Sequence, residues 1–281
     1  MKRLIDNIYH LWDALREIRG VNLPKDLKRK IRRSYLRAIF LKRYDSQSSM
    51  VNIVGYRVKF CRYRTFSRLF KAIFLNQIYH FVTDKANPFI IDCGSNIGMS
   101  VLYFKMIYPD SEILAFEPDR EAYSCLETNV RLNELKSIET IKKAISNKEG
   151  RIDFWFDQEN PGSLRGSIIR ERMPKQRQEV EAACLSKYID REVDFLKIDV
   201  EGAERDIIEE LSNERKLHYI KQMIIEYHHH IVKDTDVFSR ILRILEDAGF
   251  GYQIESGLKR PLKRQRFQDI LIYAYQKDYT A

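Results

Sequence analysis

The sequence predicts an α/β protein whose mostly parallel sheet carries helices on both faces. Between residues 89 and 248, short apolar runs take turns with segments in which apolar residues recur at helical spacing. The first run leads into a turn with two glycines and then into a helix, an arrangement typical of ligand-binding α/β sheets. The last two apolar runs, 251–255 and 269–275, have no helix between them, which predicts an antiparallel pair at a sheet edge.

The amino-terminal region is predicted to form two basic helices. Residues 4–18 place apolar side chains at alternating steps of four and three, and a second amphipathic helix is predicted over 25–44, opening at Pro24. The first 45 residues contain thirteen Lys and Arg against five Asp and Glu, a surplus of eight in a chain of net charge +9. We therefore expect residues 1–48 to form a basic helical extension and residues 49–281 one larger domain.

The larger domain is predicted to begin with a hairpin, 51–60, and a short capped helix, 65–75. An insert, 151–180, contains a strand, 152–156, ahead of a loop rich in turn formers, which fits either a substrate lid or ordinary surface. The core elements are predicted, in order, as the strand from Phe89, helix 99–108, strand 112–116, helix 119–132, strand 137–145, strand 193–198, helix 203–211, strand 220–227 and helix 237–248.

The composition favours a globular protein in a reducing compartment. A hydrophobic content of 44% is enough to build a core, and the four cysteines have no paired short spacing, which argues against a zinc site or a disulfide framework. No apolar run reaches the ~20 residues that cross a bilayer, and the start of the chain is too polar for a secretory signal. We expect a cytoplasmic protein, and the basic extension fits contact with the inner membrane face, a polyanion or plain solvent.

The turn after the first strand contains Gly94 and Gly98, four residues apart. A dinucleotide-binding turn needs three glycines, the second of which lets the backbone approach a pyrophosphate, but Ser95 and Asn96 occupy this part of the turn. The turn also lacks the lysine and the serine or threonine that a triphosphate loop requires. It therefore favours a ligand without a pyrophosphate.

Acidic residues at neighbouring strand ends describe a nucleoside pocket beside a small polar pocket. Glu117 ends the second strand and is placed to accept hydrogen bonds from two ribose hydroxyls. S-adenosylmethionine fits both pockets. The backbone N–H groups from Gly94 to Gly98 would bind its carboxylate. Asp92 and Asp199 would favour its ammonium and sulfonium charges.

Two further strand ends supply candidate catalytic residues. One carries Asp199, Glu201 and Glu204, and the next carries Glu226 and His228. A hydroxyl loses its proton as it attacks a sulfonium methyl, so His228 is the candidate base, with Glu201 or Glu226 orienting it or the substrate. No metal is expected, although Asp199, Glu201 and His228 form a set that could hold a divalent ion. For Glu204, a role limited to the helix amino terminus is the alternative to a role in the site.

Four motifs follow one another along the chain: Ile91-Asp92-Cys93-Gly94-Ser95-Asn96-Ile97-Gly98, Phe116-Glu117-Pro118-Asp119, Lys197-Ile198-Asp199-Val200-Glu201-Gly202-Ala203-Glu204 and Glu226-Tyr227-His228. They resemble the motifs of the FkbM-type methyltransferases, a branch of the class I S-adenosylmethionine-dependent enzymes. The resemblance covers about residues 50–275 and implies a Rossmann-like, seven-stranded sheet and O-methylation, often of a sugar or natural-product hydroxyl.

The resemblance also implies a cofactor site. It implies that Ala144 to Asn147 lie near the adenine, although an acid is common where this chain has Asn147. The residues predicted to bind S-adenosylmethionine are Asp92, Gly94, Ser95, Asn96, Gly98, Glu117, Pro118, Ala144, Ile145, Asn147 and Asp199.

The leading hypothesis is an S-adenosylmethionine-dependent O-methyltransferase that acts on a hydroxyl of a carbohydrate, glycan or natural product. A nucleic-acid methyltransferase is the nearest rival, but the strand-end motif at Asp199 lacks the proline and aromatic pair that clamps a flipped base amine. The third hypothesis is a non-catalytic module that binds S-adenosylmethionine or docks to a membrane. The acceptor and the oligomeric state are not readable from the sequence.

Overall fold

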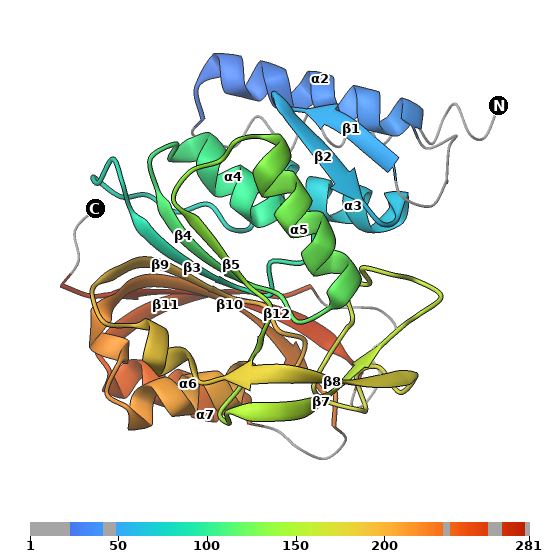
Figure 1. Cartoon of the computed structure of the whole chain (residues 1–281). Helices are drawn as coiled ribbons and strands as arrows, with labels where there is room; N and C mark the ends of the chain where they lie inside the picture. The colour runs from blue at the N-terminus through green and yellow to red at the C-terminus, as the bar shows by residue number, and fades with distance from the viewer. Residues whose placement is uncertain (1–22, 42–48, 233–236, 258–265, 279–281) are drawn as a thin grey trace.

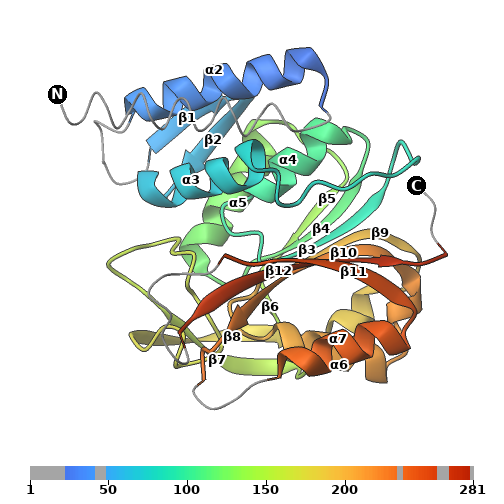
Figure 2. The same ribbon diagram turned by 180° about the vertical axis from the view of Figure 1, so that it is seen from behind.

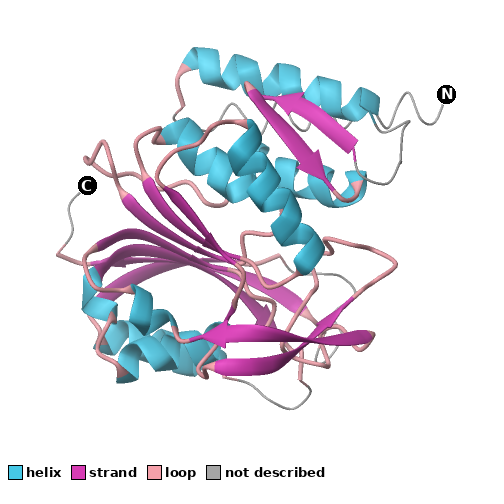
Figure 3. Ribbon diagram, in the orientation of Figure 1, coloured by secondary structure: helices cyan, strands magenta, loops and turns pink. Residues whose placement is uncertain are grey.

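The computed structural model describes residues 23–41, 49–232, 237–257 and 266–278. Its main sheet has seven strands, β3 (Phe89–Cys93), β4 (Glu112–Phe116), β5 (Ile138–Ile141), β9 (Val193–Ile198), β10 (Ile220–His229), β11 (Phe250–Glu255) and β12 (Gln268–Gln276). They lie in the order β11-β12-β10-β9-β3-β4-β5 (Figures 1 and 3). In this order, the strands β10, β9, β3, β4 and β5 are parallel to one another. At one edge, β12 pairs antiparallel with β10, and β11 pairs antiparallel with β12. The predicted α/β class and the antiparallel edge pair are confirmed.

Helices cover both faces of this sheet. One face carries α4 (Met99–Ile107) and α5 (Arg120–Leu132), and the other carries α6 (Glu204–Asn213) and α7 (Phe238–Asp247), as Figure 2 shows from behind. The helix α5 begins where the side chain of Asp119 accepts a hydrogen bond from the backbone N–H of Ala122 at 2.8 Å, a standard amino-terminal cap.

The amino-terminal segment forms a further layer over α4 and α5 (Figures 1 and 2). Here α2 (Lys25–Leu41) packs on a hairpin of β1 (Ser49–Ile53) and β2 (Tyr56–Phe60). The predicted helix 4–18 and the boundary at residue 48 lie outside the described residues, so the division into two parts stays a prediction. No helix in the described ranges is both long enough and apolar enough to cross a membrane.

The helix predicted over 65–75 is in fact two joined helices. An α-helix, α3 (Tyr63–Leu69), continues without a break into a π-helix, η2 (Phe70–Leu75), and no side chain caps the first turn. The wider π-helical turns follow a row of buried aromatic rings. Phe66 packs at a tilt against Phe70, with 6.0 Å between ring centroids, and Phe70 stacks on Phe74 at 5.2 Å. Packing of these rings, rather than local propensity, sets the conformation of this segment.

The strand predicted over 137–145 was wrong in its extent. The chain leaves the main sheet after Ile141, and β6 (Ala144–Ile145) pairs instead in a second sheet of order β6-β8-β7. That small sheet also contains β7 (Gly150–Phe156) and β8 (Gln176–Ala183). The sequence signal for β8 is weak because its side chains are mostly polar and exposed.

Candidate active site

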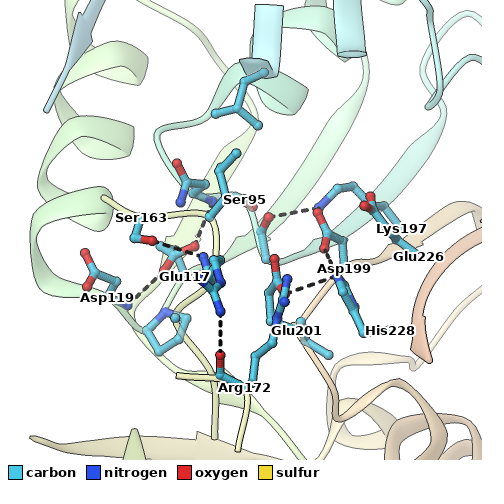
Figure 4. A pocket seen from close by; sticks show the side chains of 18 of the residues that line it. Ser95, Glu117, Asp119, Ser163, Arg172, Lys197, Asp199, Glu201, Glu226 and His228 are labelled. Carbon is cyan, nitrogen blue, oxygen red and sulfur yellow. Dashed lines mark hydrogen bonds and ion pairs between the residues drawn. The ribbon is translucent and has the colours of Figure 1, made fainter. Parts of the chain in front are cut away.

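A cavity of about 740 Å³ opens at the carboxyl ends of β3, β4, β9 and β10, where α/β sheets bind ligands. Figure 4 shows two groups of side chains in it. The group at the Glu117 end contains Ser95, Glu117, Asp119 and Ser163. The group at the His228 end contains Lys197, Asp199, Glu226 and His228.

Two glycines allow the first turn to approach its neighbours closely. Gly94 has φ +87°, and a Cβ at this position would lie 1.8 Å from the backbone oxygen of Asp199. Gly98 has φ +83°, and a Cβ there would lie 2.7 Å from the side chain of Leu126 on α5. Gly94 lies on the cavity wall whereas Gly98 does not, so Gly98 acts by positioning α4.

Most of the N–H groups that were expected to bind a carboxylate are used within the protein. The N–H groups of Gly94 and Ser95 donate to the carbonyl of Phe116, and that of Gly98 donates to the carbonyl of Ser95. The N–H of Asn96 donates to Glu117 Oε2 at 2.7 Å. These four donors are already satisfied within the protein. Of the turn's N–H groups, only that of Ile97 lacks a partner in the described part of the chain, so the turn offers a carboxylate one backbone donor at most.

Asn96 supplies a polar atom that fits a ligand. Its Oδ1 is buried and, within the described part of the chain, accepts no hydrogen bond. An unpaired buried acceptor costs free energy, and a donor group of a bound molecule would remove that cost. Asn96 lies on the cavity wall and has a left-handed backbone with φ 47°, which holds it in this position.

Glu117 lies on the cavity wall with its carboxylate fixed from behind. Oε2 accepts from Asn96, and Oε1 accepts from the N–H of Asp119 at 2.8 Å. Burial first, and then the charge of Asp119, raises the pKa of Glu117 to about 8. The predicted contact to two ribose hydroxyls is compatible with this position and stays a prediction.

Asp92 lies behind the cavity wall and not on it. It is fully buried, pairs with Lys197 Nζ at 3.0 Å, and accepts a hydrogen bond from Ser100 Oγ. Lys197 Nζ also donates to the carbonyl of Gly94 at 2.8 Å and lies 3.7 Å from Asp199 Oδ2. Burial alone would lower the pKa of Lys197, but Asp92 and Asp199 outweigh it and raise that pKa. Asp92 therefore holds a cation in place under the site instead of facing a ligand's charge.

Asp199 and Glu226 share one donor at the His228 end. The hydroxyl of Tyr79 lies 3.0 Å from Asp199 Oδ2 and 3.2 Å from Glu226 Oε2, and it can donate to one of them at a time. Burial, followed by the neighbouring charge of Asp199, raises the pKa of Glu226 to about 8. Tyr79 comes from the segment after η2, which the sequence analysis did not connect with the site.

His228 is held between two carboxylates. Its Nδ1–H donates to Glu204 Oε1 at 2.8 Å, while Nε2 lies 3.1 Å from Glu201 Oε2 and 4.0 Å from Asp199 Oδ1. Burial alone would lower the pKa of His228, but Glu201, Glu204 and Asp199 outweigh it and raise that pKa well above its ordinary value. Glu204 is fully buried and bonded to the ring, which favours a role in the site over one limited to the helix end.

Glu201 is positioned by the insert. Arg172 forms an ion pair with Glu201 Oε2, and Ser167 Oγ donates to the Glu201 carbonyl at 2.6 Å. Glu201 has φ 59°, an uncommon conformation for this residue type that the surrounding contacts sustain. The guanidinium of Arg172 also lies 4.3 Å from the ring centroid of Phe267. The insert therefore forms part of the cavity wall, as the lid interpretation requires.

The remaining predicted cofactor residues divide into two groups. Pro118, Ala144 and Ile145 line the cavity near the Glu117 end. Asn147 is exposed and does not line it. The chain turns away from the cavity after Ile145, because β6 pairs there with β8.

A divalent ion could be held by a set that differs from the predicted one. One ligand atom each from Asp199, Glu226 and His228 lie within 4.8 Å of one another. Glu226 replaces the Glu201 of the predicted set, because Arg172 already engages Glu201.

A family comparison identifies the chemistry of this cavity. The model of the methyltransferase FkbM domain matches residues 92–252, which is more than half of the chain. The chain belongs to the FkbM methyltransferase family. It is therefore an S-adenosylmethionine-dependent methyltransferase, and the hypothesis of a non-catalytic module is set aside. The free Asn96 Oδ1 and the wall residues Glu117 and Asp199 fit that cofactor.

Curated relatives agree with this family. Methyltransferase sdnD of Sordaria araneosa is 28% identical over 215 residues, which cover 65% of this chain and 81% of the relative. The 2-O-methyltransferase NoeI of Sinorhizobium fredii is 31% identical over 146 residues, covering 44% of this chain and 58% of NoeI. The crystal structure of methyltransferase FkbM from Methylobacillus flagellatus KT is 17% identical, with a TM-score of 0.46, and the match covers 76% of this chain and 54% of that one.

Proposed function

We propose that this FkbM-family enzyme transfers the methyl group to a hydroxyl of a carbohydrate, glycan or natural product. The main support is the environment of His228. Its Nδ1–H is committed to the buried Glu204, which leaves Nε2 as the nitrogen near the cavity carboxylates. A positioned imidazole of this kind suits an acceptor that must lose a proton on methylation, as a hydroxyl does.

The proposed reaction is a single displacement. The bound cofactor supplies an electrophilic methyl group on a sulfonium. The acceptor oxygen would take this methyl group, the sulfur would keep the electron pair of the broken bond, and Nε2 of His228 would accept the hydroxyl proton. Glu204 stabilises the imidazolium that results, as a buried carboxylate does for a catalytic histidine.

The other residues at the His228 end would orient the acceptor. Asp199 and Glu226 present carboxylate oxygens that accept hydrogen bonds from neighbouring hydroxyls of a polyol. Phe267 lies beside His228, with 6.1 Å between ring centroids, and offers an apolar surface on the same wall. A cavity with several acceptors and an aromatic face suits a sugar-like molecule. The name of NoeI, a 2-O-methyltransferase, supports oxygen as the methylated atom.

The proposal is tested by turnover on a panel of acceptors. Purified protein would be incubated with S-adenosylmethionine and panels of glycans, polyols, amines and RNA, and S-adenosylhomocysteine release would be measured. We expect release with hydroxyl acceptors only. His228→Ala should lower turnover by about 10²-fold or more while S-adenosylhomocysteine still binds, and His218→Ala, an exposed histidine off the cavity, is the matched control. Turnover on amines or RNA alone would refute the proposal.

A further inference from the structure

One wall of the cavity is formed by residues 63–79, which precede the family-matched residues 92–252. On this wall Arg64, Arg68 and Ala72 follow one another at steps of four, so they lie on the same side of the helical segment. The wall changes character along its length. It is cationic and exposed at Arg64 and Arg68, apolar through Leu69, Ala72 and Ile73, and buried at Tyr79.

The two arginines have no protein partner that would explain them. Within the described part of the chain, the guanidinium groups of Arg64 and Arg68 make no hydrogen bond or ion pair. Other cations of the same cavity do have acidic partners, since Arg172 pairs with Glu201 and Lys143 lies 3.9 Å from Glu181. Like charges one helical turn apart repel each other, and an anion bound between these two arginines would remove that repulsion.

A third arginine reaches the same cavity from the insert. Arg165 is exposed, lines the cavity, and donates one guanidinium N–H to the carbonyl of Arg172 at 3.3 Å. This bond leaves most of its donors for a ligand. Two separate segments of the chain therefore bring guanidinium groups to one cavity, and the paired N–H donors of a guanidinium match carboxylate, phosphate and sulfate oxygens.

The turn from Gly94 to Gly98 leaves few backbone donors for an anionic ligand. Its N–H groups at Gly94, Ser95, Asn96 and Gly98 already donate within the protein. We propose that Arg64, Arg68 and Arg165 form the anion-binding site of this cavity, which takes a carboxylate, phosphate or sulfate group of a bound ligand. Two sources supply this chemistry. One is the carboxylate of the methyl donor, which follows from the family; the other is an acidic group on the acceptor, which rests on the proposed function.

The first arm of the test measures the cofactor. Calorimetry would give the dissociation constants of S-adenosylhomocysteine and of 5′-methylthioadenosine, which lacks the amino-acid end, for the wild type and for Arg64→Ala/Arg68→Ala. If the site holds the cofactor carboxylate, the double variant should weaken S-adenosylhomocysteine by about tenfold and leave methylthioadenosine unchanged. Arg243→Ala, an exposed arginine on α7 away from the cavity, is the matched control.

The second arm measures the acceptor side. Protein saturated with S-adenosylhomocysteine would be titrated with glucose 6-phosphate, glucose 6-sulfate, glucuronate and neutral glucose. If the site holds an acceptor anion, the anionic sugars should bind more tightly than glucose, and the double variant and 0.5 M NaCl should each remove that preference. If the double variant loses affinity in either experiment, the anion site is supported, and the ligand affected shows which molecule carries the anionic group.

The proposal is overturned when the double variant changes neither arm. That outcome differs from failure of the proposed function. If the double variant methylates a neutral hydroxyl acceptor with the KM of the wild type, O-methylation is upheld and the anion site is ruled out. Conversely, loss of S-adenosylhomocysteine affinity without turnover on any hydroxyl would uphold the site and refute O-methylation. Arg165→Ala alone should reproduce part of the loss of ligand affinity seen in the double variant. Thermal melting would confirm that each variant is folded.

Discussion

After Glu201, the charge on Glu204 contributes to the raised pKa of His228. Glu204→Gln keeps an oxygen that accepts from Nδ1–H but removes an anion 2.8 Å from the ring, so the raised pKa of His228 should fall. His228 must be neutral to accept a proton, and activity therefore rises with pH through that pKa. We expect the acidic limb of the kcat/KM profile to move down by about one pH unit.

The control for this experiment is on the same helix. Glu209 lies on α6 with a partly exposed side chain paired to Arg240 at 2.8 Å, and it does not line the cavity. Glu209→Gln should leave the profile where it is. A profile that stays unchanged in Glu204→Gln as well would show that Glu204 only supports the helix end.

Glu117 links the cofactor site to the pH dependence of stability. Its pKa is raised from 4.5 to about 8 in the folded protein, so the folded state binds this proton more tightly than the unfolded chain does. The stability from this proton is complete below pH 4.5 and is lost as the pH rises through 8. Glu117→Gln is neutral at every pH, and its melting temperature relative to the wild type should therefore be higher at pH 9 than at pH 5. Scanning calorimetry at both values tests this, and an equal difference at both would contradict it.

The site residues that could be predicted from the sequence lie at the carboxyl ends of neighbouring strands. Asp199, Glu201, Glu226 and His228 meet because their strands are neighbours, and parallel order can be inferred from alternation. Asp92 was misassigned because Lys197 reaches it from the adjacent strand, and a cross-strand ion pair leaves no mark in local sequence. Tyr79 and Arg172 were missed, and the contact of Glu204 with His228 was not predicted, because the partners of these residues are far away in the chain.

At the scale of elements, the turn between β3 and α4 can pack against Asp199 only because Gly94 has no side chain. A Cβ would lie 1.8 Å from the Asp199 backbone oxygen, and backbone cannot move aside as a flexible side chain can. Gly94→Ala should lower the free energy of unfolding by more than about 3 kcal/mol, as measured by urea denaturation. Gly150→Ala is the matched control, because Gly150 has a similar φ of +95° with nothing within 4 Å of the added Cβ. It should cost only about 1 kcal/mol, and equal losses at both positions would show that φ alone matters.

Element type was predictable where periodicity was strong and unpredictable where packing decided it. The strands β3, β9 and β10 are apolar runs between turn signals, and the sequence indicates them clearly. The π-helix of η2 has the same residue pattern as an α-helix, so only the aromatic stack beneath it distinguishes the two. The switch of β6 to the small sheet depends on β8, whose polar face gives little strand signal.

At the scale of the whole molecule, the cavity joins parts of the chain that are remote in sequence. Its walls come from residues 63–79, from the ends of β3, β4, β9 and β10, and from the insert around Arg172. The sequence predicted the strand-end part because it follows from the fold class. The other two walls could not be predicted, since they are set by how the amino-terminal layer and the insert pack over the sheet.

A ligand that contacts all of these walls should stabilise them together. S-adenosylhomocysteine at 100 times its dissociation constant adds about 2.7 kcal/mol to the stability of the folded state. For a chain of this size that corresponds to a rise in melting temperature of roughly 5–10 °C, while NAD, whose pyrophosphate the turn at Gly94 does not suit, should give none. Hydrogen exchange should slow in residues 63–79 and 163–172 as well as at the strand ends, because the cavity is lined by all three. Slower exchange confined to the strand ends would show that the amino-terminal wall and the insert do not close on the cofactor, and a shift with NAD alone would contradict the cofactor assignment.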